Sequence, residues 1–253
     1  MLPGAGATIA VWWQQVRPFS REFNLALVDF PGHVQRRLAG GQQGVTFDGP
    51  YEFDILVSGL AAALQQAGLM RYHLVTLSLG TVLGRALVAR HPDRVLSAIH
   101  AGTIAELTPL PHVLMIAGHS ARHVLPYMLL YRMYAWVIMP GRAHRRTRML
   151  FYRDARGLGR HEFHRWFALS ASVVPLLKEL RERYVRVPTF HVVGEHDYMF
   201  RKPTEELAAF EGSEISIVPG VGHACSVEAP DEFNRIALGF IGRTRNERSA
   251  CRE

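Results

Sequence analysis

The stretch from Tyr72 to Arg90 constrains the fold of this chain most strongly. An apolar, β-branched run ends at Ser78, Gly80 follows two residues later, and a helical pattern continues to Arg90. A strand, a tight turn and a helix with a serine at the apex hold a hydroxyl out above a sheet, beside the free N–H groups of the helix N-terminus. The usual pattern for such a turn is Gly-x-Ser-x-Gly, and Thr76 occupies its first small position. Taken alone, the motif is equally consistent with a strand that merely ends in Ser-Leu-Gly.

Alternating strand and helix patterns continue on both sides of this stretch. β-branched and apolar runs bounded by Gly, Pro and Asp favour strands, whereas apolar residues three or four apart favour helices. We predict further strands at 24–28, 95–100, 187–193 and 215–218, and further helices at 9–16, 54–67, 203–210 and 231–241. This alternation predicts an α/β fold with a mostly parallel sheet that helices flank on both faces.

The alternation stops in the middle of the chain, where the pattern predicts helices only. Breaks are expected at Pro126, at 140–141 and at 157–159, because Pro and Gly interrupt helices. We expect this segment to be a helical cap inserted into the α/β core. The predicted organisation is a core at 1–102 and 187–242, an inserted helical cap at 103–186, a loop at 34–50 and a polar, frayed tail at 243–253.

The charge balance is basic but does not point to a nucleic-acid partner. The 253 residues include 29 Lys+Arg and 22 Asp+Glu, which gives a formal net charge of +7. No known nucleic-acid-binding module is recognisable, so no such partner is expected. The arginine-rich run at 142–148 is typical of a solvated helix face, and a weak contact with an anionic membrane surface stays open. The apolar run at 125–139 is too short to span a bilayer, so no membrane span is expected.

The two cysteines, Cys225 and Cys251, do not form a disulfide framework. A reducing compartment is therefore the default, and we expect a cytoplasmic protein. The first residues lack the basic and apolar regions of a signal peptide, which agrees with that expectation.

Three residue types needed for nucleophilic catalysis each follow a predicted strand. Ser78 follows one strand, Asp197 follows the next to last, and His223 follows the last. The carboxyl ends of parallel strands collect functional groups at one edge of a sheet. A serine nucleophile needs a base to take its proton and a carboxylate to orient that base. The order Ser, Asp, His is therefore a candidate catalytic constellation, with Glu195 as the weaker candidate for the carboxylate.

Four segments resemble the α/β-hydrolase superfamily, in its capped branch of serine esterases, lipases and C–C hydrolases. The resemblance covers essentially residues 2 to 242. The segments are LVDFPGH at 27–33, LSLGTVLGRALVARHPDRV at 77–95, VPTFHVVGEHD at 187–197 and GHACSVEAPDEFNRIALGFI at 222–241. The last two are the most specific, because the spacing after the histidine also fits.

The resemblance implies a role for each residue of the constellation. Ser78 would attack an acyl carbonyl, His223 would act as base and then as acid, and Asp197 would hold the imidazole tautomer. Backbone N–H groups of Ala5 and Leu79 would form the oxyanion hole. No cofactor and no metal are implied, and the partner would be a small-molecule, ester-type substrate. A serine at this turn is unlike the haloalkane-dehalogenase and epoxide-hydrolase branches, which use an aspartate.

The chain departs from the family pattern in three places. Thr76 replaces the first glycine of the turn, where a β-branched residue would crowd it. Pro3 stands where the family usually has histidine. In the family, a central strand precedes that loop, between the strands predicted here at 24–28 and 72–77, whereas only Met1 and Leu2 precede Pro3. We therefore expect an apparently shortened N-terminus. The alternatives are that other residues fill the gap or that the chain is less stable than its relatives.

The sequence leaves three functions open. The first is a serine hydrolase that cleaves carboxylic esters of small to medium acyl chain. The second is C–C bond or amide hydrolysis, or perhydrolysis, with the same triad, and the third is a non-catalytic binding protein of hydrolase fold. Candidate residues for an apolar acyl pocket are Leu110, Val113, Leu114, Met128, Leu129, Met133, Trp136 and Trp166. The natural substrate and the oligomeric state are not determined by the sequence.

Overall fold

The core of the molecule is a parallel sheet of four strands, seen in a computed structural model that describes residues 1–33 and 49–250. Most of the loop predicted at 34–50 lies outside the described residues. The strands, in both chain and sheet order, are β1 (Tyr72–Leu77), β2 (Val95–Ala101), β3 (Thr189–Gly194) and β4 (Glu214–Val218). Each pair of neighbours is parallel, and the four strands agree with the prediction to within two residues.

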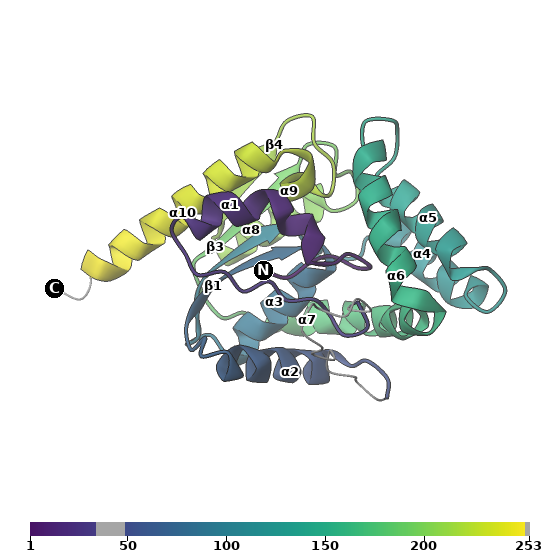
Figure 1. Ribbon diagram of the computed structural model, residues 1–253, viewed down its shortest axis with the longest axis horizontal. Coiled ribbons are helices and arrows are strands. Elements are labelled where there is room, and N and C mark those ends of the chain that lie inside the picture. The colour runs from purple at the N-terminus through teal and green to yellow at the C-terminus, as the bar shows by residue number, and fades with distance from the viewer. Residues whose placement is uncertain (34–48, 251–253) are drawn as a thin grey trace.

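Helices cover both faces of this sheet, as Figure 1 shows. One face carries α2 (Phe53–Gln66), α3 (Leu79–Arg90) and α7 (Val173–Glu182). The other carries η1 (Ile9–Trp12), α1 (Trp13–Ser20), α9 (Cys225–Glu228) and α10 (Pro230–Ala250). The helix α8 (Arg201–Glu211) connects β3 to β4 and packs on both. The predicted architecture, a parallel sheet flanked by helices, is confirmed.

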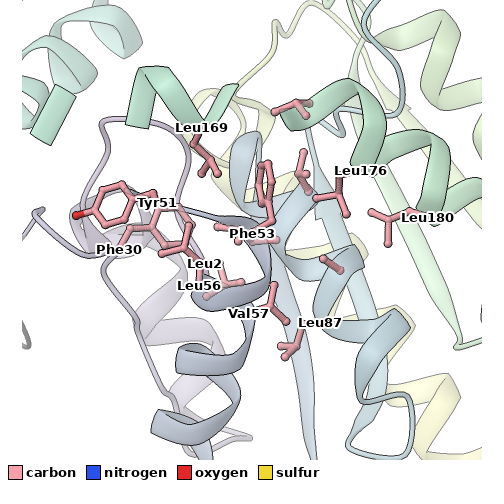
Figure 2. Packing of buried hydrophobic residues seen from close by; sticks show 14 of the residues in the cluster. Leu2, Phe30, Tyr51, Phe53, Leu56, Val57, Leu87, Leu169, Leu176 and Leu180 are labelled. Carbon is pink, nitrogen blue, oxygen red and sulfur yellow. The ribbon is translucent and has the colours of Figure 1, made fainter. Parts of the chain in front are cut away.

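Alternation along the strands produces two hydrophobic cores. Leu74 and Ala98 point to the α2, α3 and α7 side, while Val75 and Ile99 point to the α1 and α10 side. Because successive side chains of a strand point to opposite faces, a strand buried on both faces is apolar throughout. Figure 2 shows the first core, in which α2, α3 and α7 interlock over the sheet. Each fully buried aliphatic side chain there contributes about 1.5–3 kcal/mol.

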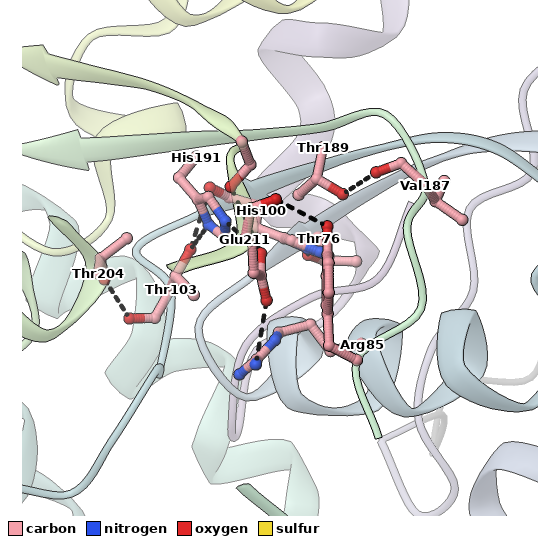
Figure 3. A network of polar contacts seen from close by, with 11 residues as sticks. Thr76, Arg85, His100, Thr103, Val187, Thr189, His191, Thr204 and Glu211 are labelled. Carbon is pink, nitrogen blue, oxygen red and sulfur yellow. Dashed lines mark hydrogen bonds and ion pairs between the residues drawn. The ribbon is translucent and has the colours of Figure 1, made fainter. Parts of the chain in front are cut away.

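Three polar side chains interrupt the apolar strands at one level of the sheet. Thr76, His100 and His191 are register partners on adjacent strands, and they face α3 (Figure 3). Thr76 Oγ1 lies 2.7 Å from His100 Nδ1, and His191 Nε2 lies 3.3 Å from Glu211, which also pairs with Arg85 at 3.4 Å. Burial lowers the pKa of His191 and lowers the pKa of His100 well below its ordinary value, so both imidazoles are neutral near pH 7. We call these five residues the polar layer.

Met1 and Leu2 lie in the sheet beside β1. Leu2 pairs with Thr76 in parallel, and its N–H donates to the Val75 carbonyl at 2.9 Å. On the other side, the Val28 N–H donates to the Met1 carbonyl at 3.2 Å. The strand predicted at 24–28 is wrong, since these residues do not form a β-strand. Met1 and Leu2 beside them are too short a segment for a continuous series of backbone hydrogen bonds.

Two helix predictions need correction at their ends. Thr8 is the predicted N-cap, with its Oγ1 accepting from Ala10 at 3.3 Å, but the first turn is a 3₁₀-helix and α1 continues to Ser20. The closing helix, predicted to end at residue 241, extends as α10 to Ala250, so residues 243–250 of the predicted tail are helical and the rest lie outside the described residues. Arg243 pairs with Glu214 of β4 at 2.5 Å in an exposed contact between α10 and the edge strand.

The segment between β2 and β3 contains helices joined by loops, and none of its residues forms a strand. Its elements before α7 are α4 (Pro109–Ala121), α5 (Tyr127–Ile138), α6 (Arg145–Leu169) and η2 (Ser170–Ser172). The predicted breaks are confirmed: Pro126 precedes α5, Gly141 lies between α5 and α6, and Gly159 has a φ of 77° that kinks α6. We call α4, α5 and α6 the helical insertion; the division of the chain into core and cap stays a prediction.

The helical insertion is anchored to the loops that precede the sheet. Asp154 of α6 accepts hydrogen bonds from the N–H and the hydroxyl of Thr8, at 3.2 and 2.8 Å. Trp166 donates from Nε1 to the Pro31 carbonyl at 3.0 Å. The insertion therefore lies across the carboxyl ends of the strands, at the right of Figure 1. No helix in the described ranges is long and apolar enough to cross a bilayer.

Candidate functional site

Ser78 occupies a strained turn between β1 and α3. Its φ of 52° and ψ of −120° make it the one non-glycine residue with positive φ in the described part of the chain. Such a conformation costs on the order of 1–3 kcal/mol and persists where the surroundings enforce it. The Ser78 carbonyl accepts from both the N–H and the hydroxyl of Thr81, each at 2.7 Å, while its N–H donates to Ala101 at 3.0 Å. These bonds hold the turn and leave the half-buried serine side chain at its apex.

Two glycines of α3 make room for the segments that pack against this turn. A Cβ on Gly80 would lie 2.5 Å from the Pro3 carbonyl oxygen, so only glycine lets the N-terminal loop pass behind the turn. A Cβ on Gly84 would lie 2.8 Å from Cγ2 of Thr76. The predicted crowding by a β-branched residue is therefore relieved on the helix, by Gly84, rather than in the strand.

His223 connects Ser78 to Asp197. Its Nε2 lies 2.8 Å from the Ser78 Oγ, and its Nδ1 lies 2.8 Å from Oδ2 of Asp197. Asp197 is fully buried, and its Oδ1 accepts from the Phe200 N–H at 3.3 Å. The structure thus brings the three residues singled out in the sequence into one chain of hydrogen bonds. Glu195, the alternative carboxylate, points elsewhere and accepts from Gly220 at 2.8 Å.

Glycines missed by sequence reasoning allow the histidine loop to approach the strands. A Cβ on Gly102 would lie 2.3 Å from the His223 carbonyl oxygen, and Gly102 has a φ of 53°. A Cβ on Gly194 would lie 2.1 Å from the Gly222 carbonyl oxygen. Gly194 is the last residue of β3, and Gly102 directly follows β2. A glycine at the end of a strand was the sequence pattern that could have indicated this close approach.

Glu228 and His144 also hold the histidine loop, and neither was singled out from the sequence. One oxygen of the Glu228 carboxylate accepts from the Gly222 N–H at 2.8 Å and lies 2.7 Å from His144 Nδ1. His144 precedes α6 and is buried. The residue next to His223 is thereby tied to the helical insertion. The spacing of Glu228 after the histidine was the available signal.

The two predicted oxyanion donors face the same space as the serine. Ala5 and Leu79 both line the cavity above Ser78. Leu79 is the first residue of α3, so its N–H has no partner within the helix. In the described part of the chain, neither N–H is used by a protein acceptor. The Ala5 carbonyl accepts from the hydroxyl of Tyr131 in α5 at 3.1 Å, and this bond ties the loop to the helical insertion.

An apolar cavity of about 260 Å³ lies between the helical insertion and the carboxyl ends of the strands. Ser78 and His223 form part of its floor, and aromatic and aliphatic side chains of α4, α5 and α6 form its walls. The hydroxyls of Tyr131 and Tyr134 are committed to the carbonyls of Ala5 and Leu114. Burial raises the pKa of both phenols, so they stay neutral. No Lys, Arg, Asp or Glu lines the cavity in the described ranges.

Most of the pocket residues expected from the sequence lie elsewhere. Leu114 and Trp166 line the cavity, and the other six do not. Met128 is half-buried outside it, and the remaining five are exposed to solvent: Leu110, Val113, Leu129, Met133 and Trp136. Both α4 and α5 have apolar side chains on two opposite faces. The prediction assigned the exposed face of each helix to the pocket, whereas the opposite face lines the cavity.

The cysteine that lies near the site, Cys225, is buried. Burial raises the pKa of the Cys225 thiol to about 12, and this thiol donates to the Val192 carbonyl at 3.2 Å. Cys225 is therefore an unreactive, structural thiol. Among the described residues, no three His, Cys, Asp or Glu side chains gather so that they could hold a metal ion.

Comparison with known proteins gives one family. The model of the alpha/beta hydrolase family matches residues 1–236. No curated protein matches the chain in sequence.

Solved structures share the fold at low identity. An enol-lactonase from Burkholderia xenovorans LB400 is 19% identical, with 95% of this chain and 90% of that chain covered and a TM-score of 0.76. A hydrolase from Pseudomonas aeruginosa PA01 is 23% identical, with coverages of 95% and 88% and a TM-score of 0.76. A thermophilic esterase from Thermogutta terrifontis is 17% identical, with coverages of 96% and 88% and a TM-score of 0.76. These likenesses extend over nearly the whole chain and concern the fold alone.

Proposed function

Because this chain belongs to the alpha/beta hydrolase family, we propose that it is a serine hydrolase that cleaves carboxylic esters with apolar acyl groups of small to medium size. The observation that carries the proposal is the chain of two 2.8 Å contacts from Ser78 through His223 to Asp197, at the floor of an apolar cavity. A hydroxyl paired with a base, and a base oriented by a buried carboxylate, is the arrangement that activates a serine.

The proposed reaction has two halves. His223 Nε2 takes the Ser78 proton as Oγ bonds to the ester carbonyl carbon, and the carbonyl oxygen becomes an oxyanion near the Ala5 and Leu79 N–H groups. Where measured, one such donor contributes about 3–4 kcal/mol to the transition state. The imidazolium then protonates the leaving alcohol, which leaves an acyl-enzyme. Water attacks this ester with His223 as base, and the carboxylic acid leaves as Ser78 recovers its proton.

The walls of the cavity set the proposed substrate class. An apolar cavity of about 150 Å³ holds benzene, so a cavity of about 260 Å³ admits an acyl group of up to about ten carbon atoms. Without a charged side chain in its described wall, the cavity offers nothing to pair with a charged acyl group, and burying an unpaired charge is costly.

A panel of p-nitrophenyl esters tests this proposal. We expect kcat/KM to rise from acetate to octanoate and to fall at palmitate, and we expect Ser78→Ala to abolish turnover. Full hydrolysis by a folded Ser78→Ala variant would refute the proposal. A C–C bond or amide hydrolase with the same triad would instead react with a fluorophosphonate and show a higher kcat/KM for its own substrate class than for any of the esters.

A further inference from the structure

The outer faces of α4 and α5 are apolar and exposed. Leu110, Val113 and Ile116 of α4 are 49%, 61% and 57% exposed. Leu129, Met133 and Trp136 of α5 are 46%, 52% and 58% exposed. Their spacing of three or four residues places each set on one side of its helix. We call these six side chains the outer face. Apolar side chains gathered in an exposed patch are characteristic of interaction sites.

The outer face lies opposite the cavity. Leu114 and Met115 of α4, and Tyr134 and Ile138 of α5, line the cavity from the other side of the same helices. The two helices are joined by a hydrogen bond from the Tyr134 hydroxyl to the Leu114 carbonyl. They lie together at one edge of the molecule, away from the C-terminal end of α10 (Figure 1). The pair is thus a thin wall with apolar side chains on both surfaces.

The charged side chains of α4, of α5 and of the loops that directly follow these two helices are all basic. From residue 107 to residue 153 the chain has seven arginines and no Asp or Glu. Arg132 is exposed beside Met133, and Arg142 is exposed just after α5. Exposed apolar side chains that include a tryptophan, with exposed arginines nearby, match the boundary between the headgroups and acyl chains of a bilayer that carries anionic lipid.

We propose that the outer face of α4 and α5 binds the surface of an anionic lipid bilayer. The apolar side chains enter the headgroup boundary, and Arg132 and Arg142 pair with lipid phosphates. A second copy of this chain fits less well, because a two-fold interface would bring the arginines of the two copies together. Binding at this face places the wall of the cavity against the membrane. Ser78, His223 and Asp197 take no part in this binding.

Sedimentation with sucrose-loaded vesicles tests the proposal. Wild type should bind vesicles of phosphatidylcholine mixed with phosphatidylglycerol, and added salt should weaken that binding. The double variant Arg132→Gln, Arg142→Gln should bind about thirtyfold more weakly, since each arginine near the surface contributes about 1 kcal/mol and a loss of about 2 kcal/mol corresponds to about thirtyfold in affinity. Val113→Glu combined with Trp136→Glu should remove binding altogether.

Matched variants separate this face from other exposed apolar side chains. Trp13 on α1 is 79% exposed, so Trp13→Glu makes the same change on a different surface and should leave vesicle binding unchanged. Fluorophosphonate labelling of each surface variant reports that its active site is folded. Ser78→Ala, which cannot be labelled, should bind vesicles as wild type does. Failure of wild type to bind, or equal loss in Trp13→Glu, would overturn the proposal. So would a dimer in sedimentation equilibrium that Val113→Glu with Trp136→Glu dissociates, because the face would then join two copies.

Discussion

Replacing Asp197 with asparagine tests the role of the carboxylate with almost no change in volume. Asp197 Oδ1 accepts from the Phe200 N–H at 3.3 Å, and Oδ2 faces His223 Nδ1 at 2.8 Å. An asparagine oxygen must stay opposite the Phe200 N–H, since two donors would otherwise meet there. Its amide NH₂ then donates to Nδ1, which forces the imidazole proton onto Nε2. A protonated Nε2 cannot accept the proton of Ser78.

We therefore expect Asp197→Asn to lower kcat by about 10⁴, or about 5.5 kcal/mol in the transition state, as in a serine protease with the same arrangement. The assay is hydrolysis of p-nitrophenyl octanoate, with thermal unfolding measured in parallel. Glu195→Gln is the matched control, because Glu195 is two residues earlier, has a side chain that is 48% exposed and does not contact His223. Retention of the wild-type rate by Asp197→Asn, or an equal loss in Glu195→Gln, would refute the reasoning.

Three more predictions concern the approach of the histidine loop, the size of the cavity and the polar layer. Gly102→Ala should lower kcat by about 10² as the new Cβ displaces His223, whereas Gly220→Ala, with a φ of 69° and nothing within 4 Å of its Cβ, should cost only stability. Steady-state kinetics of both variants checks this, and equal kcat losses would contradict it. Ala135→Leu adds three carbons to the cavity wall and should lower the ratio of kcat/KM for octanoate over acetate by about tenfold or more; an unchanged ratio would mean that acyl chains bind elsewhere. The two buried histidines have a lower pKa in the folded state, so the unfolded state binds more protons below about pH 6.5, and stability should fall by up to about 1.4 kcal/mol per histidine per pH unit as the pH decreases through that window. Urea unfolding from pH 7.5 to pH 5 measures this slope, and a flat profile would contradict it.

The sheet and the candidate site could be predicted because local patterns and chain order determined them. Ser78, Asp197 and His223 each follow a strand, and parallel strands bring such positions to one edge. The strand expected at 24–28 could not be judged from its own residues, because a strand needs a neighbour of matching length. Here the neighbouring position holds Met1 and Leu2.

The faces of α4 and α5 could not be assigned from the sequence. Trp136 and Ile138 are both apolar, yet Trp136 is exposed and Ile138 lines the cavity. A helix that is apolar on two sides has no polar face to indicate which side is buried. The same ambiguity hid Tyr131, whose hydroxyl reaches the oxyanion loop across 126 residues of sequence. Contacts of that kind depend on the folded arrangement of the insertion and leave no local pattern.

Covalent labelling of Ser78 tests the central claim most directly. Intact-mass spectrometry after treatment with a fluorophosphonate should show one adduct per chain, located on the peptide that contains Ser78, and ester hydrolysis should disappear in step with labelling. Ser78→Ala should keep its melting transition and take up no label. A folded wild-type protein that forms no adduct, or one that keeps hydrolysing esters after Ser78 is fully modified, would contradict the account.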